Sequence, residues 1–429
     1  MRVDKYSGYL DKGYRPGKGE FVAEFFVEPE KGCGFENAIQ AVAAESSVGT
    51  WTELSTQTKK NFEKFRPHIF EWNSKTGLAK IAYPPDLFEE GNLSQLMSGL
   101  CGNIFGVSML RNLRLQDIDF PEDYIKSFRG PAFGIGGIRK LMKVKDRPFV
   151  GTIIKPKLGL GAQEHAKVAY NAWLGGLDFV KDDENLTSMK FNKFEDRIKA
   201  TLKLRDRAEQ ETGEKKMYFA NITAPYNEMV RRAKIVKRNG GEYVMIDVLT
   251  AGFSAVQQFR EEDFGLVLHG HRAMHAAFTR NPKHGISMLV IAKLYRLAGL
   301  DQLHIGAIIG KMEGNAEEVE TIEDNIEKRI VKENAGGHAL AEDWAGMKPM
   351  LAVCSGGLHP GHVPELVKKL GNDIVMQFGG GVHGHPLGTI GGAKAARQAV
   401  DSVMKKIPIQ EYAKYHRELD LSLQKFKGK

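Results

Sequence analysis

The sequence predicts an α/β protein, in which a C-terminal (β/α)₈ barrel follows a smaller α+β N-terminal domain. Three observations support this fold class. The length of 429 residues accommodates one barrel of roughly 250 residues and an added domain. Eight short apolar runs alternate with helical stretches, and many of the 47 glycines follow those runs. The hydrophobic content of 42% is too high for a disordered chain.

The first 130 residues show mixed patterns. Alternating apolar residues predict strands at 20–28 and 77–83, and helical spacing predicts helices at 34–44 and 93–105. Pro121 and the Arg129-Gly130-Pro131 stretch then interrupt the pattern. We therefore expect an N-terminal domain over residues 1–130 and a barrel domain over 131–429.

Beyond this boundary the pattern becomes regular. The eight expected strands are Phe149–Lys155, Phe179–Asp183, Met217–Thr223, Tyr243–Leu249, Leu266–His271, Gln302–Ala307, Met350–Ser355 and Ile374–Phe378. Their starts are 23 to 48 residues apart, which leaves room for a crossover helix each time. The alternative, an open doubly wound sheet, is expected to carry a dominant phosphate loop after its first strand, and this chain has none there. The pattern favours a closed parallel barrel.

Composition excludes several classes of protein. Cys33, Cys101 and Cys354 are odd in number and form no CxxC pair, which argues against a disulfide framework or a zinc ribbon and predicts a reducing, cytoplasmic location. The chain shows neither a signal-peptide pattern nor an apolar run of 18 residues, so we expect no membrane association. The net charge is +8, but the basic clusters at 139–145 and 231–238 are short and lack aromatic residues. We expect no nucleic-acid partner.

Polar residues stand at the ends of most expected strands, where barrel enzymes place their chemistry. Lys181 and Asp183 share a strand face, and Glu184 can join them where the strand ends. Two carboxylates and a third oxygen ligand suit Mg²⁺. The lysine is then either a counter-ion or, after reaction with CO₂, an oxygen ligand. A solvated turn remains an alternative for this tetrapeptide taken alone.

The glycine-rich turns indicate phosphate binding. Ser355-Gly356-Gly357 and Gly379-Gly380-Gly381 follow the last two strands, where barrels often build phosphate sites from backbone N–H groups. Lys311, between Gly310 and Gly314, is placed like a cation on a mobile lid. Arg272 and His304 can serve a second anionic group, so the substrate would be a bisphosphate. The pair His269 and His271 alone is only a weak zinc signal.

These residues resemble the signatures of the ribulose-1,5-bisphosphate carboxylase/oxygenase (RuBisCO) large chain. The resemblance covers about residues 20–400, in family order. The motifs that carry it are GLDFVKDDEN at 176–185, KPK at 155–157, HRAMH at 271–275, GKMEG at 310–314, QFGGG at 377–381, ESSVGTW at 45–51 and GNIFG at 102–106.

The resemblance implies a role for each matched position. Lys181 would take up CO₂ as a carbamate (N6-carboxylysine), hold Mg²⁺ with Asp183 and Glu184, and act as the base that forms the enediolate. Lys155 would move protons, supported by Lys157 and His271, and Lys311 would stabilise the incoming CO₂. The implied substrate contacts are Thr50, Trp51, Gly356, Gly357, Gly379 and Gly380 at one phosphate, Arg272 and His304 at the other, Ser355 at a sugar hydroxyl, Gln377 within its motif, and Glu45 and Asn103 reaching in from a partner subunit.

The resemblance also implies the reaction and the partners. Ribulose 1,5-bisphosphate and CO₂ would give two 3-phosphoglycerate, with O₂ in a side reaction. The minimal unit would be a homodimer with shared sites, which larger rings can contain. Ile153, which replaces a threonine of the plant enzymes, and the short C-terminal tail resemble the archaeal form III branch. That branch lacks small subunits and is linked to ribose-phosphate salvage from AMP. The alternative is a RuBisCO-like enolase acting on a sulfur-containing sugar phosphate, but relatives of that kind usually lose several of these residues.

Overall fold

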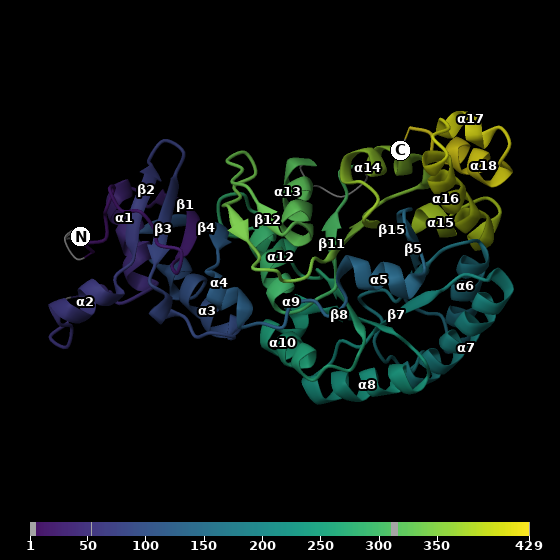
Figure 1. The fold of residues 1–429 in the computed structure, drawn as a ribbon, viewed down its shortest axis with the longest axis horizontal. Coiled ribbons are helices and arrows are strands. Elements are labelled where there is room, and N and C mark those ends of the chain that lie inside the picture. The colour runs from purple at the N-terminus through teal and green to yellow at the C-terminus, as the bar shows by residue number, and fades with distance from the viewer. Residues whose placement is uncertain (1–5, 53, 310–315, 429) are drawn as a thin grey trace. The chain divides into compact units, whose positions relative to one another are not determined.

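The computed structural model describes residues 6–52, 54–309 and 316–428 (Figure 1). Contacts between Cα atoms divide the chain into two compact units. The first contains Met1–Arg129, Met274–Ala298 and Lys328–Met347, and the second contains Gly130–Ala273, Gly299–Glu327 and Lys348–Lys429. Two segments within the sequence range 131–429 thus group with the N-terminal residues.

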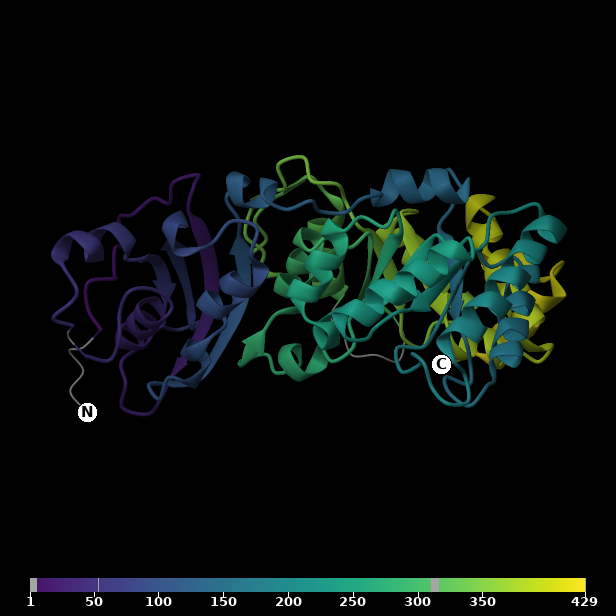
Figure 2. The ribbon, with the colours of Figure 1, turned by 90° about the horizontal axis from the view of Figure 1, so that it is seen from below.

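The first unit is built on a five-stranded sheet in the order β10-β4-β1-β3-β2. Its strands are β1 (Phe21–Pro29), β2 (His68–Asn73), β3 (Leu78–Tyr83), β4 (Leu110–Asp119) and the short β10 (Gly285–Ile286), and they run side by side in Figure 2. The helices of this unit are α1 (Phe35–Glu45), α2 (Lys59–Phe65), α3 (Leu93–Leu100), α4 (Glu122–Lys126), α11 (Ala276–Thr279) and α12 (Met288–Leu297). Short strands β12 (Ile330–Val331) and β13 (Glu342–Asp343) form a separate pair.

The expected helix over 93–105 is too long. Helix α3 ends at Leu100, and a separate 3₁₀ turn covers Asn103–Gly106. Gly102 between them has φ −83° and ψ −129°, and a Cβ placed on it would lie 2.1 Å from the carbonyl oxygen of Ser98. The backbone therefore turns sharply at a position that only glycine can occupy.

The second unit is a closed parallel barrel, as the sequence predicts. Its strands are β5 (Phe149–Ile153), β6 (Phe179–Lys181), β7 (Met217–Asn221), β8 (Tyr243–Asp247), β9 (Val267–His271), β11 (Gln302–Gly306), β14 (Leu351–Ser355) and β15 (Ile374–Phe378). They close in the order β11-β14-β15-β5-β6-β7-β8-β9, because β9 pairs in turn with β11. All eight expected barrel strands are present.

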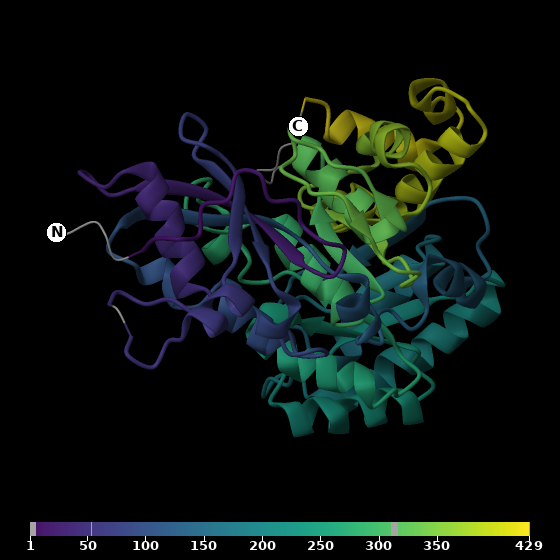
Figure 3. The same cartoon turned by 60° about the vertical axis from the view of Figure 1, so that its left-hand side comes forward.

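Helices surround this barrel. They are α5 (Gly134–Met142), α6 (Ala162–Leu174), α7 (Phe194–Thr212), α8 (Tyr226–Arg238), α9 (Val248–Ala251), α10 (Phe253–Glu261), α13 (Ala316–Glu327), α14 (Val363–Leu370), α15 (Gly380–His383), α16 (Gly388–Met404), α17 (Ile409–Ala413) and α18 (Arg417–Lys425). The last three pack against one another and are yellow in Figure 3.

Large apolar side chains fill the barrel interior. Phe149, Phe179, Phe219 and Tyr243 are fully buried and belong to one cluster. Their rings contact one another, with centroids 4.7 to 5.6 Å apart. The barrel is thus a packed core whose chemistry is confined to the strand ends. Among the described residues, no helix is long and apolar enough to cross a membrane.

Candidate active site

The carboxyl ends of the barrel strands bring together most of the polar residues singled out in the sequence. Lys155 follows β5, Lys181 ends β6, and His271 ends β9. His304 lies in β11, Ser355 ends β14, and Gly379 follows β15. Because parallel strands of a barrel end at one face, residues from distant parts of the chain meet there.

Lys181 is a buried amine, with 1% of its surface exposed. Its Nζ donates to the carbonyl oxygen of Asp182 at 3.0 Å and lies 3.4 Å from Sδ of Met245. Burial lowers the pKa of Lys181, although the surrounding carboxylates, foremost Glu184 and Asp183, act in the opposite direction. The side chain therefore has an increased tendency to be a neutral, nucleophilic amine.

Asp183 is a carboxylate held by a neighbouring cation. Its Oδ2 accepts a hydrogen bond from Lys155 Nζ at 2.7 Å, and Oδ1 accepts one from the amide of Asn185 at 3.1 Å. Burial alone would raise the pKa of Asp183, but these bonds outweigh it and lower the pKa to about 2. Asp183 is therefore ionised at neutral pH.

His271 lies between two further carboxylates. Its Nε2 is 3.8 Å from Glu184 Oε2, and its Nδ1 is 3.4 Å from Asp247 Oδ1. Burial and the nearby Lys181 lower the pKa of His271. Asp247 Oδ1 is buried and has no hydrogen-bond partner among the described residues.

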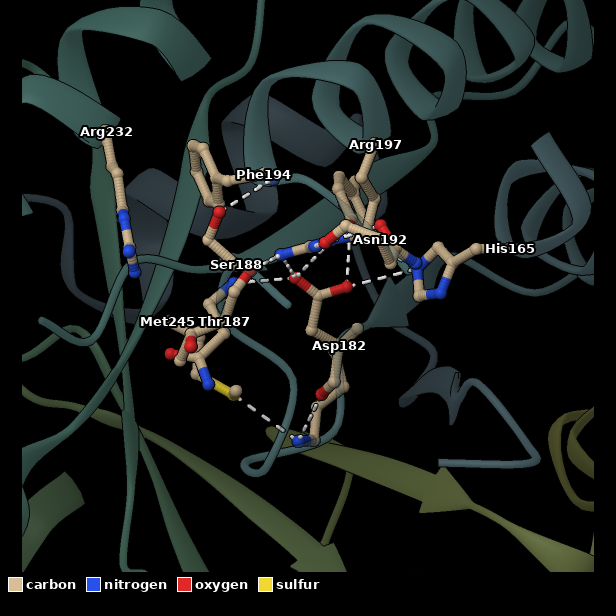
Figure 4. A network of polar contacts seen from close by, with 12 residues as sticks. His165, Asp182, Thr187, Ser188, Asn192, Phe194, Arg197, Arg232 and Met245 are labelled. Atoms are coloured by element: carbon tan, nitrogen blue, oxygen red, sulfur yellow. Dashed lines mark hydrogen bonds and ion pairs between the residues drawn. The ribbon is translucent and has the colours of Figure 1, made fainter. Parts of the chain in front are cut away.

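A buried network around Asp182 supports the loop that carries these groups (Figure 4). One oxygen of Asp182 accepts hydrogen bonds from Arg197 Nε at 3.3 Å and from the Asn221 amide N–H at 2.9 Å. The other accepts from the Tyr218 hydroxyl and lies 3.1 Å from His165 Nε2. No motif in the sequence marks this network. The only sequence feature that points to the network is the position of Asp182 between Lys181 and Asp183. In an extended chain, the side chain of Asp182 lies on the opposite face from those of its two neighbours.

Four polar residues form a second buried chain across β9, β11 and β14. Gln302 Oε1 is 2.9 Å from His269 Nδ1, His269 Nε2 is 2.9 Å from His304 Nε2, and His304 Nδ1 is 2.7 Å from Ser355 Oγ. The two ring nitrogens of His269 thus face Gln302 and His304 rather than a shared zinc position with His271.

The predicted glycines occupy positions that suit a close backbone approach. Gly356 and Gly357 have φ values of 115° and 77°, a region that favours glycine. A Cβ on Gly379 would lie 3.6 Å from Cε of Lys155, whereas one on Gly380 would meet nothing within 4 Å. The turn after β15 is thus adjacent to the lysine that follows β5.

The other predicted site residues of the barrel differ in their surroundings. Lys157 is exposed. The guanidinium of Arg272 donates to the carbonyl oxygen of Ile305 at 3.2 Å. Gln377 is 1% exposed, and neither polar atom of its side chain has a hydrogen-bond partner among the described residues. Lys311 lies outside the described residues.

Glu45, Thr50, Trp51 and Asn103 belong to the first unit. Glu45 ends α1 and accepts a hydrogen bond from the Tyr6 hydroxyl at 2.6 Å. Trp51 is 65% exposed, which is unusual for so large an apolar side chain, and Asn103 is exposed in the 3₁₀ turn after α3.

The residues around Lys181 fit a carbamate and a magnesium ion. Asp183 and Glu184 offer hard carboxylate oxygens, and a carbamate on Lys181 would add a third. The amine is buried, and it is also within the electrostatic influence of Asp247, whose buried Oδ1 has no hydrogen-bond partner among the described residues. Neutralising such an amine removes the repulsion between an ammonium and a cation. Without that modification, the described residues contain no group of three His, Cys, Asp or Glu side chains that could hold a metal ion.

A closed parallel barrel with lysines, carboxylates, histidines and glycine turns at its strand ends defines an enzyme of the (β/α)₈ class. Family models identify the particular family. The model described as the ribulose bisphosphate carboxylase large chain, catalytic domain, matches residues 134–426, and that of the N-terminal domain matches residues 8–124. The chain belongs to the RuBisCO large-chain family.

Archaeal relatives match almost the whole chain. A protein of Methanosarcina mazei named ribulose bisphosphate carboxylase is 51% identical over 421 residues, covering 97% of this chain and 98% of its own. One of the same name from Methanocaldococcus jannaschii is 50% identical over 426 residues, covering 98% and 100%.

Solved archaeal structures are also similar. A dimeric RuBisCO from Hyperthermus butylicus has a TM-score of 0.92 at 46% identity, covering 97% of this chain and 98% of its own. An octameric RuBisCO from Pyrococcus horikoshii, described in complex with a sulfate ion, has a TM-score of 0.89 at 47% identity, covering 97% and 96%.

Proposed function

We propose that this protein is a Mg²⁺-dependent ribulose-1,5-bisphosphate carboxylase. The observation that carries the proposal is the buried Lys181, next to Asp183 and Glu184 at the mouth of a barrel of this family. The names of the archaeal relatives support the same substrate and reaction. A carboxylase of this kind joins CO₂ to the bisphosphate and yields two molecules of 3-phosphoglycerate.

The metal would be held by three side chains: Asp183, Glu184 and Lys181 in its carbamate form. When bound, the carbamate and Mg²⁺ would supply oxygen ligation, a base and stabilisation of negative charge on the enediolate. The chain itself prepares this position. The network around Asp182 fixes the backbone beside Lys181, and burial favours the neutral amine that can react with CO₂.

We assign proton handling to Lys155. The assignment is supported by the 2.7 Å distance between its Nζ and Asp183 Oδ2, one of the carboxylates proposed to bind the metal. We assign supporting roles to His271, which lies near Glu184, and to Lys157. Lys311 completes the set as the lid cation that stabilises CO₂ and the new carboxylate, by resemblance alone.

Two anchors would hold the two phosphates. Backbone N–H groups at Gly356, Gly357, Gly379 and Gly380 suit one phosphate, with Thr50 and Trp51 added from the N-terminal domain. Arg272, a permanent cation, suits the other. The resemblance assigns His304 to the same phosphate as Arg272. In the structure, both ring nitrogens of His304 lie within hydrogen-bond distance of protein atoms. We assign Ser355 at the end of β14 to a sugar hydroxyl, and Gln377 near the end of β15 to the substrate-binding residues.

The active form is proposed to be a homodimer in which Glu45 and Asn103 complete the partner's site. The dimeric and octameric archaeal structures support an oligomer of this kind. We also propose that the enzyme works without a small subunit, shows an oxygenase side reaction and acts in ribose-phosphate salvage from AMP. The archaeal relatives and Ile153 support this form III assignment.

Incubation with ribulose 1,5-bisphosphate, Mg²⁺ and ¹⁴CO₂ tests the proposal. We expect two molecules of 3-phosphoglycerate per bisphosphate consumed and one label per pair, with no turnover after chelation of the metal. The absence of product with bisphosphate, Mg²⁺ and CO₂ all present would contradict the proposal, and enolisation of a sulfur-containing sugar phosphate would then favour the RuBisCO-like alternative.

A further inference from the structure

The chain of hydrogen bonds from Gln302 to Ser355 has a definite direction. It runs through His269 and His304 on three neighbouring barrel strands, and its links measure 2.9, 2.9 and 2.7 Å. Gln302, His269 and His304 are at most 2% exposed, so water does not compete for these links. Ser355, at the end of β14, is partly exposed and forms the outer end of the chain.

The proton position at one link determines the position at the next. A neutral imidazole has one N–H donor and one bare nitrogen acceptor. Burial lowers the pKa of both His269 and His304 well below the usual value for histidine. Both rings are therefore neutral at ordinary pH, and each must donate at one nitrogen and accept at the other.

Gln302 sets the direction because it presents an oxygen. Oε1 can only accept, so His269 must carry its hydrogen on Nδ1 and accept at Nε2. His304 must then donate from Nε2, which leaves its Nδ1 bare. The bare Nδ1 accepts the hydroxyl hydrogen of Ser355.

We propose that Gln302 and His269 are positioning residues that hold His304 as the Nε2–H tautomer and thereby make Ser355 a hydrogen-bond acceptor toward the substrate. Because the hydroxyl hydrogen of Ser355 is donated to His304, Ser355 Oγ can only accept a hydrogen bond from the substrate. It therefore favours an O–H donor, such as a hydroxyl of a sugar phosphate, over a phosphate or carboxylate oxygen. This inference rests on the proposed function for the identity of the substrate, but the direction of the chain does not.

Neutron diffraction from crystals of the perdeuterated full-length protein tests the direction. We expect deuterium on His269 Nδ1 and His304 Nε2, and the Ser355 deuteron directed at His304 Nδ1. Deuterium on His304 Nδ1 would overturn the proposal. Because this measurement needs no turnover, a protein that shows the expected tautomers but fixes no CO₂ would refute the proposed function alone.

Gln302→Met tests the role of the glutamine, because it removes the acceptor and nearly keeps the volume. In ¹⁵N NMR of histidine-labelled protein, we expect His304 to gain the Nδ1–H tautomer, and KM for the bisphosphate to rise on the order of ten-fold while kcat changes less. Gln40→Met is the matched control, because Gln40 is a buried glutamine of the first unit that accepts from the Tyr9 amide. It should leave the His304 signals unchanged. An unchanged His304 tautomer in Gln302→Met would overturn the role of Gln302, and the wild-type neutron result decides the direction if that variant does not fold.

Discussion

Lys181 shows how burial can change the chemistry of one side chain. An exposed lysine is an ammonium ion, which repels a metal and does not react with CO₂. The amine of Lys181 is instead held by a backbone carbonyl and a thioether, and burial lowers its pKa. The nearby ionised Asp183 is stabilised by Lys155 rather than by Lys181. These surroundings favour a neutral amine at Lys181.

Lys181→Met should abolish carboxylation, with a loss of at least about a thousand-fold in kcat, because position 181 then supplies neither the third oxygen ligand nor the base. The measurement is ¹⁴CO₂ incorporation at saturating Mg²⁺. Lys216→Met is the matched control, since Lys216 is equally buried but donates to the Leu177 carbonyl and to Glu214. That variant should lose stability and keep its activity per folded molecule. Comparable activity loss in the two variants would argue against a special role for Lys181.

At the scale of elements, the Asp182 network connects β6 to α7 and β7. Arg197 on α7 is fully buried, and Asp182 is its ionic partner. Arg197 also donates to the carbonyl oxygen of Thr187, so the loop after β6 is fixed at two points. The position of the Lys181–Glu184 segment therefore depends on a helix that itself contributes no catalytic group.

Asp182→Asn should destabilise the protein by about 3–5 kcal/mol, because it leaves the buried Arg197 without a charge partner. Urea unfolding measures this loss. Asp206→Asn provides the comparison, since the Arg205–Asp206 pair has a carboxylate that is 57% exposed. We expect its cost to stay below about 1 kcal/mol. Equal costs for the two variants would show that burial of the pair is not the cause.

We expect Glu327, the last residue of α13, to make the stability of the protein depend on pH. Burial, together with the charges of Glu323 and Asp373, raises the pKa of Glu327 to about 9. The folded state therefore holds a proton that the unfolded state releases above its ordinary pKa, so stability is lost as pH rises from about 4.5 toward 9. Glu327→Gln stays neutral and should be more stable than wild type by about 3–5 kcal/mol at pH 8 and little changed at pH 5.

Chemical unfolding across this pH range measures the effect. Glu318→Gln, an exposed position on the same helix, should follow the wild-type curve. A pH dependence that persists in Glu327→Gln would show that another group is responsible.

The sequence predicted the barrel strands because each is a short apolar run followed by polar residues or glycine, as in Phe149–Ile153 and Ile374–Phe378. It did not predict β4, although this is the longest strand among the described residues. Arginine, asparagine, glutamine and aspartate interrupt the apolar alternation of Leu110–Asp119. The polar networks could not be predicted from the sequence either. The partners of Asp182 and His304 lie up to 51 residues away in the chain, and only the fold brings them together.

At the scale of the whole molecule, the candidate site residues are distributed over both compact units. The barrel unit contains the lysines, carboxylates and histidines of the candidate site, whereas Glu45, Thr50, Trp51 and Asn103 are in the other unit. The excess of basic residues, 61 against 53 acidic ones, is small for this length. In the proposed function, the cations that face the substrate are the few at the strand ends, Lys155, Lys157 and Arg272, and they suit a doubly phosphorylated molecule.

A heterodimer of two inactive variants provides the most direct test of a site formed around Lys181 and completed by Glu45 of a second subunit. Differently tagged Glu45→Gln and Lys181→Met chains are co-expressed, and the mixed dimer is purified by both tags. If sites are shared between subunits, one of the two sites contains both native residues. Carboxylation should then return to about half the wild-type rate per dimer. A mixed dimer as inactive as its two parents would contradict the shared site.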